Sequence, residues 1–190
     1  MFKTLVLLGV TTCAGWAGTV TFTLSATASG ILGGTPFSNS LMTITVLADT
    51  STPSDPFSST IAVGALSASF NTESPTVFFN PSCGDFAGNP PCAGFEINAG
   101  DLLDIPSASL AGYVLGTPIG PINAASLTGN PALLGTVYDT DGGGSMTLSA
   151  LSNGTFTASV GGSSVPEPAA LALVGCGLSV LGLLQRRKQR

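Results

Sequence analysis

The chain has 190 residues, of which only 8% are charged, and its formal net charge is −5. Its Lys and Arg residues lie near the ends, at Lys3 or beyond Gln185, and it contains no His. A central region without cations cannot neutralise phosphate, so we exclude nucleic acid as a partner. Without Lys or His it also cannot build a Schiff base or a Ser-His-Asp arrangement, which leaves carboxylate chemistry, cation binding through oxygen ligands, or no catalysis. We expect no cofactor.

Residues 1–17 predict a secretory signal peptide. Lys3 supplies a minimal positive start, residues 5–10 are apolar, and Gly15-Trp16-Ala17 has the small-x-small pattern of a cleavage site. We therefore expect signal peptidase to cut between Ala17 and Gly18. An uncleaved N-terminal anchor is the alternative.

Three stretches in the first half predict strands. Residues 19–29 and 42–48 alternate apolar with mostly Thr or Ser side chains, which is the period of a half-buried strand. Glycines at 30, 33 and 34 predict the turn between them. Residues 49–59 are expected to form a loop, and residues 60–71 a third strand with a bulge near Gly64. The Thr row at 19, 21 and 23 is interpreted as the wet face of a strand, with an ordered-water or ice-binding face as the alternative.

The second half predicts further short strands. Candidates lie at residues 77–79, 107–114 and 133–138, while residues 116–130 are rich in Gly, Pro and Asn and predict a surface loop. Residues 146–150 and 156–160 are expected to form a hairpin around Asn153-Gly154, because Asn-Gly is a strong turn signal.

Short strands separated by turn residues, without an amphipathic helix pattern, predict a mainly β protein. We expect a single β-sandwich-like domain of antiparallel strands at residues 18–160. An N-terminal signal helix and a C-terminal transmembrane helix are expected to flank it.

Two of the four cysteines are expected to form a disulfide. Cys13 belongs to the signal and Cys176 to the apolar C-terminal segment, which leaves Cys83 and Cys92 in the exported part. In an oxidising compartment these two are expected to pair. Closing this loop should contribute about 2–3 kcal/mol. A metal site, the alternative, needs further Cys or His ligands that the domain lacks.

Acidic residues offer only weak candidate sites. Asp139 and Asp141 precede three glycines and are weak candidates for a calcium loop, although a plain turn is favoured. Two further pairs have the residue types of a glycosidase: Asp101 with Asp104, and Asp85 with Glu96. No aromatic cluster for sugar stacking accompanies them, and the central region lacks cations, so we predict that the protein is not an enzyme. Because a plain turn is favoured at Asp139 and Asp141, we assign no metal site.

The C-terminal segment at residues 166–190 has three parts. Pro166-Glu167-Pro168 predicts a stiff, extended peptide, because proline fixes φ and lacks a backbone donor. Residues 169–184 are uncharged and reach about 24 Å as a helix, a little short of a hydrocarbon core of about 30 Å, and predict a transmembrane helix. A stop-transfer cluster on the cytoplasmic side follows: Arg186, Arg187, Lys188 and Arg190. Residues 161–165 are expected to form a linker.

The order of Pro-Glu-Pro, apolar run and terminal Arg cluster in residues 166–190 resembles the PEP-CTERM sorting signal of Gram-negative bacteria. The resemblance implies recognition by a membrane-embedded exosortase that cuts near the Pro-Glu-Pro, in bacteria that make exopolysaccharide, biofilm or floc. The sequences SGILGGTPF and MTITVLADT, after a Thr-rich start, resemble the secreted β-domain often found before such signals. An ordinary C-terminal membrane anchor is the alternative.

We therefore expect a non-catalytic surface or matrix protein. It would be anchored in the inner membrane before processing, then found at the cell surface or outside the cell, with exopolysaccharide as a candidate partner. A carbohydrate-active or calcium-binding exoprotein that uses the acidic loops is the alternative.

Overall fold

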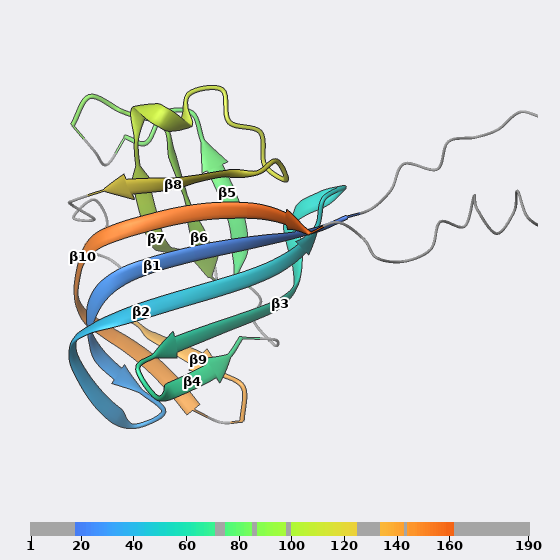
Figure 1. Ribbon diagram of the computed structural model, residues 1–190. Coiled ribbons are helices and arrows are strands. Elements are labelled where there is room, and N and C mark those ends of the chain that lie inside the picture. Colours follow the sequence, from blue (N-terminus) through green and yellow to red (C-terminus); the bar gives the residue numbers. More distant parts are fainter. Residues whose placement is uncertain are drawn as a thin grey trace, which may run out of the picture.

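The strands of the domain form two antiparallel sheets in a computed structural model, which describes residues 18–70, 75–84, 87–97, 100–124, 134–142 and 144–161 (Figure 1). The predicted mainly β, antiparallel class is confirmed for these residues. The elements are β1 (Thr19–Leu32), β2 (Thr35–Asp49), β3 (Thr52–Val63), β4 (Leu66–Ser69), β5 (Thr76–Asn80), β6 (Cys92–Ile97), β7 (Gly100–Pro106), the 3₁₀ helix η1 (Ala108–Leu110), β8 (Ile119–Ala124), β9 (Val137–Thr140) and β10 (Gly144–Gly161).

The larger sheet has the order β4-β3-β2-β1-β10-β8, and β9 pairs with the first part of β10. The long strands β2, β1 and β10 form its centre, with β1 paired on both sides from Thr19 to Leu32. The sheet curls until the turn after β9 meets β4, where the Asp141 amide donates to the Ser69 carbonyl over 2.8 Å. The smaller sheet, β5-β6-β7, contributes to the same core, which gives the sandwich-like arrangement that the sequence predicted (Figure 1).

The core lies between the two sheets because side chains alternate along each strand. On β1, Val20, Phe22 and Leu24 are completely buried. Phe22 stacks on Phe156 of β10 with ring centroids 6.1 Å apart. The smaller sheet adds fully or almost fully buried side chains to the same cluster: Val77, Ala93, Phe95, Leu103 and Ile105.

The predicted loop at residues 49–59 is wrong, because β3 begins at Thr52. Pairing with β2 continues to Asp49 through two register shifts, which accommodate Pro53 and Pro56 on the strand. The bulge predicted near Gly64 is also wrong. Gly64 has φ +59° and lies in the turn between β3 and β4.

The predicted hairpin at Asn153-Gly154 is wrong, because β10 runs through it as one strand. The register passes from Ser152 opposite Thr27 to Thr155 opposite Ser25. Two β10 residues therefore oppose one residue of β1, as in a β-bulge. Asn153 takes a φ of 52°, which Asn tolerates better than most residues, so the local turn signal is satisfied without reversing the chain.

The predictions for residues 107–138 are partly wrong. The strand expected at residues 107–114 is replaced by η1, where the Ser109 amide donates to the Ser107 hydroxyl over 3.2 Å. The loop expected at residues 116–130 contains β8, which pairs with β10. Pairing with β10, which is distant in the sequence, makes residues 119–124 a strand.

The two ends of the described domain lie side by side. Thr19 is paired with Gly161 because β1 and β10 are antiparallel neighbours. The Gly18 amide donates to the Thr50 hydroxyl over 2.9 Å, and the Thr50 amide donates back to the Gly18 carbonyl over 2.8 Å. The chain therefore enters and leaves the domain at the same end, next to the β2–β3 turn (Figure 1).

Candidate functional surface

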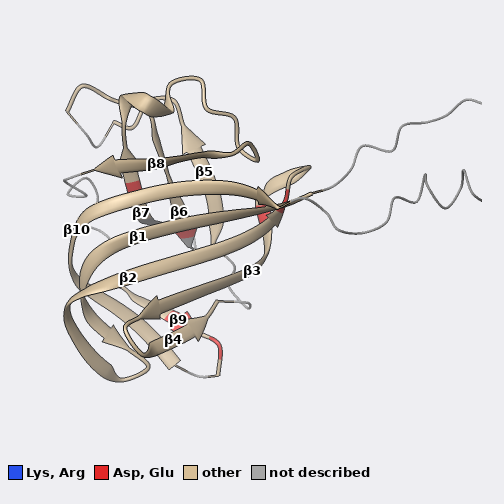
Figure 2. Ribbon diagram, viewed as in Figure 1, with Lys and Arg blue, Asp and Glu red and all other residues tan. Residues whose placement is uncertain are grey.

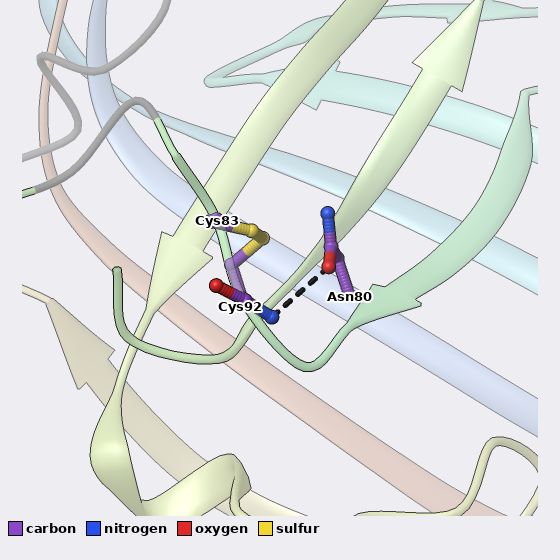
Figure 3. Close-up of a disulfide and its surroundings, with 4 residues drawn as sticks. Asn80, Cys83 and Cys92 are labelled. Atoms are coloured by element: carbon purple, nitrogen blue, oxygen red, sulfur yellow. Dashed lines mark hydrogen bonds between the residues drawn. A yellow bond between two sulfur atoms is a disulfide. The ribbon is translucent and has the colours of Figure 1, made fainter.

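The disulfide predicted between Cys83 and Cys92 is confirmed, with a Cα–Cα distance of 5.9 Å (Figure 3). Cys92 is completely buried and Cys83 is 6% exposed. The Cys83 amide donates to the Pro90 carbonyl over 2.9 Å, and Asn80 is paired with Cys92 in the β5–β6 ladder. The bond therefore fastens the β5–β6 connection to the central strand of the smaller sheet.

Acidic residues are dispersed over several elements of the described domain (Figure 2). Asp49 lies at the end of β2, Asp104 on β7 and Asp139 on β9. Within the described residues, no three His, Cys, Asp or Glu side chains come close enough to hold a metal ion.

Asp139 and Asp141, the weak calcium candidates, lie in the hairpin between β9 and β10. Asp139 is exposed and is paired with Ser145. The backbone amide of Asp141 joins this hairpin to β4 through the Ser69 carbonyl. The plain turn that this pattern predicts is therefore confirmed at Asp141 and Gly142.

The β6–β7 ladder carries three of the four carboxylates that the sequence groups as candidate glycosidase pairs. Glu96 lies opposite Asp101, so the register brings together one member of each predicted pair, and Asp85 lies outside the described residues. Asp104 is only 6% exposed and lies opposite Gly94. A Cβ atom on Gly94 would lie 2.7 Å from an Asp104 carboxylate oxygen, so the missing side chain makes room for this buried carboxylate.

Asp49 stabilises a turn. Its carboxylate accepts hydrogen bonds from the Ser51 hydroxyl at 2.6 Å and the Ser51 amide at 2.7 Å. These two bonds favour the charged form and lower the pKa of Asp49. This carboxylate therefore has a structural role in the β2–β3 turn.

Tyr113 is a buried phenol in the loop before β8. Its ring packs edge-on against Phe79 and Phe156, with centroid distances of 5.8 and 6.3 Å. Its hydroxyl donates to the Thr117 carbonyl over 3.2 Å. Burial raises the pKa of Tyr113 to about 12.

The outer face of the larger sheet carries a regular array of hydroxyl groups. Thr23 of β1 lies between Thr45 of β2 and Thr157 of β10 in the register. We name this array the hydroxyl face, and its members on the three central strands are Thr21, Thr23 and Ser25 (β1), Thr43 and Thr45 (β2), and Thr155, Thr157 and Ser159 (β10). The array continues to Thr60 on β3 and Asn123 on β8.

The sequence predicts one strand of the hydroxyl face but not the face itself. The Thr row at 19, 21 and 23 lies on β1, and Thr19 is paired with Asp49 and Gly161 at its edge. Residues 43–45 and 155–159 show the same alternation in the sequence. Only the pairing of β1 with both β2 and β10 reveals that the three rows are neighbours.

Most residues predicted for sorting lie outside the described residues: Ala17, Pro166, Glu167, Pro168, Arg186, Arg187, Lys188 and Arg190. The predicted signal helix and the predicted transmembrane helix at residues 169–184 lie outside them too. Gly18 is the first described residue. Within the described part of the chain, no helix has the length and apolar character needed to span a membrane.

Comparison of the chain with protein-family models, with curated proteins and with solved structures finds no match. Its function is therefore inferred from its own residues and their arrangement.

Proposed function

We propose that the chain is an exported, non-catalytic surface or extracellular-matrix protein, delivered by exosortase-type sorting through residues 166–190. One structural observation supports this route, namely that Gly18 and Gly161 lie together at one end of the domain. A signal peptide and a C-terminal anchor must both reach the same membrane before processing. Because the two ends of the domain lie together, both flanking segments can reach one membrane at the same time. Neither segment has to extend along the length of the domain.

The distance between the domain and the Pro-Glu-Pro also suits cleavage. β10 is paired with β1 up to Gly161, and four residues separate Gly161 from Pro166. The five Cα–Cα steps across them reach about 17 Å when extended. A cut near Pro166 would therefore leave both sheets and their core intact.

The described surface favours a non-catalytic role. One exposed carboxylate, that of Asp49, is engaged in a turn, and the described residues contain no cluster suited to a metal ion. The centre of the outer face presents neutral hydroxyl groups. These features suit a non-catalytic protein of the surface or matrix.

The decisive experiment is the intact mass of the mature protein from cells with and without their exosortase. We expect a product that starts at Gly18 and ends near Pro166–Pro168 only when the enzyme is present. A product that retains Arg190 in both strains would show a permanent anchor and contradict the proposal.

Two variants locate the signal. Replacing both Pro166 and Pro168 with Ala should abolish C-terminal cleavage, because the extended peptide is lost. Replacing Ser163 and Ser164 with Ala, the matched control in the linker, should leave cleavage unchanged. A periplasmic reporter fused after Gly162 should be active, and an inactive reporter would contradict the proposed topology.

A further inference from the structure

The hydroxyl face repeats in two directions, across the strands and along them. Neighbouring strands lie about 4.8 Å apart, and alternate residues along a strand lie about 6.7 Å apart. From Thr21 to Ser25 the pairing of β1 with β2 and β10 contains no register shift. The first shift on the β10 side comes after Ser25, and the first on the β2 side after Ala28. Eight of the nine positions in this three-by-three array carry a hydroxyl group, and Leu47 is the ninth.

The array is rigid before it meets any partner. β1 is hydrogen-bonded on both sides, and Thr side chains are restricted at χ1 by their branched Cβ. The hydroxyls of Ser25 and Thr43 lie 3.3 Å apart across the β1–β2 pair, and the Thr155 hydroxyl donates to the Asn123 side chain over 2.8 Å. A preorganised surface loses little conformational entropy on binding.

The chemistry of the face selects a neutral partner. None of the nine positions carries a charge or an aromatic ring, and neither do the flanking Thr60 and Asn123. Phosphates and acidic polymers therefore find no cation here, and sugar rings find no aromatic side chain to stack on. A hydroxyl group can both donate and accept hydrogen bonds, as a water molecule can.

We propose that the hydroxyl face binds ice. The surface of a hexagonal ice crystal presents neutral oxygen atoms in rows whose repeats lie close to the two spacings of the sheet. The hydroxyl groups of Thr and Ser can occupy positions in that lattice, while the Thr methyl groups contact the space between them. This inference rests on the outer face alone and is independent of the export route.

The twist of the sheet limits how strongly the hydroxyl face can affect the growth of ice. Adjacent strands rotate by about 20–25°, so a flat crystal face meets only the central rows around Thr23 at one time. We therefore expect slower growth of ice grains in a frozen sample, together with only a small gap between the melting and freezing temperatures.

The experiment compares three proteins, each as exported by cells, in an assay of ice-grain growth. Thr23→Lys removes the central hydroxyl and adds a charge. Thr76→Lys makes the same change at an exposed position of β5 on the smaller sheet. The unmodified protein and Thr76→Lys should slow grain growth equally, whereas Thr23→Lys should need about tenfold more protein for the same effect, which corresponds to about 1.4 kcal/mol.

Three results would overturn the proposal. They are unmodified protein that leaves grain growth unchanged, a Thr23→Lys protein as active as the unmodified one, and an equal loss in both Lys variants. Thermal melting followed by circular dichroism verifies that each variant is folded. If Thr23→Lys unfolds, Thr45→Val replaces it, because Val keeps the shape of Thr without the hydroxyl group. The mass experiment on sorting is unaffected by any of these outcomes.

Discussion

The two faces of the larger sheet are made by the same strands but have opposite compositions. On β1, Val20, Phe22 and Leu24 are completely buried, whereas the intervening Thr21 and Thr23 remain partly exposed. Burial of apolar surface is the main favourable term in folding, so the inner face should carry most of the stability. The outer face needs only to suit water or a partner, and it does so with hydroxyl groups in place of charges. Strand alternation thus separates stability from recognition within a single element.

Neighbouring residues on opposite faces give the largest expected contrast. Phe22→Ala should lower the free energy of unfolding by about 3–5 kcal/mol, because it leaves a cavity beside Phe156. Thr23→Ala should change it by less than about 1 kcal/mol, the span of strand propensities. Urea unfolding of both variants measures the difference, and equal effects would show that the outer face also stabilises the domain.

Removing the disulfide tests whether the smaller sheet is stabilised by this covalent bond as well as by its buried side chains. Replacing both Cys83 and Cys92 with Ser should lower the free energy of unfolding by about 2–3 kcal/mol, because the unfolded chain loses a constraint. Denaturant unfolding with and without a reductant measures this. Reductant should destabilise the unmodified protein and leave the Ser variant unchanged. Equal unfolding of both proteins without reductant would contradict a stabilising bond.

Close backbone approach within the larger sheet predicts an intermediate effect at Gly30. A Cβ atom there would collide with the Thr147 carbonyl oxygen of β10, so Gly30→Ala should cost about 1–3 kcal/mol. Gly84→Ala is the matched control, because its Cβ meets nothing within 4 Å. Thermal melting compares the two, and a Gly30→Ala protein as stable as the control would show that β1 and β10 separate easily.

The smallest expected effect is a change in the free energy of unfolding at alkaline pH, and it comes from Tyr113. The pKa of its phenol is raised from 10.0 to about 12, so the folded state keeps a proton that the unfolded chain loses. The free energy of unfolding should therefore be unaffected by this group below pH 10 and should fall between pH 10 and 12. In Tyr113→Phe the decline across this interval should be smaller, as measured by urea unfolding at several pH values. An identical slope in both proteins would contradict the burial effect.

The alternation of apolar and polar residues allowed several strands to be predicted from the sequence. The number and positions of the cysteines allowed the disulfide to be predicted. Residues 19–29 predicted the core of β1 and residues 42–48 that of β2, and Cys83 and Cys92 were the two cysteines left outside the predicted signal and anchor segments. The candidate sorting residues were also proposed from the sequence, and they lie outside the described residues except for Gly18. The pairing of Glu96 with Asp101 could not be predicted, because the β6–β7 register that places them opposite each other cannot be deduced from either strand alone.

What the sequence by itself determined is therefore the β class, the alternation of buried and exposed positions, and the cysteine pairing, since each depends on residue type and short-range spacing. Only the tertiary structure decided that Asn153 forms a bulge, that Gly18 and Gly161 meet, and that Thr45, Thr23 and Thr157 stand in one row. The physical reason is that a strand's backbone hydrogen bonds are completed by partners distant along the chain. Such partners are selected by the burial of the whole core.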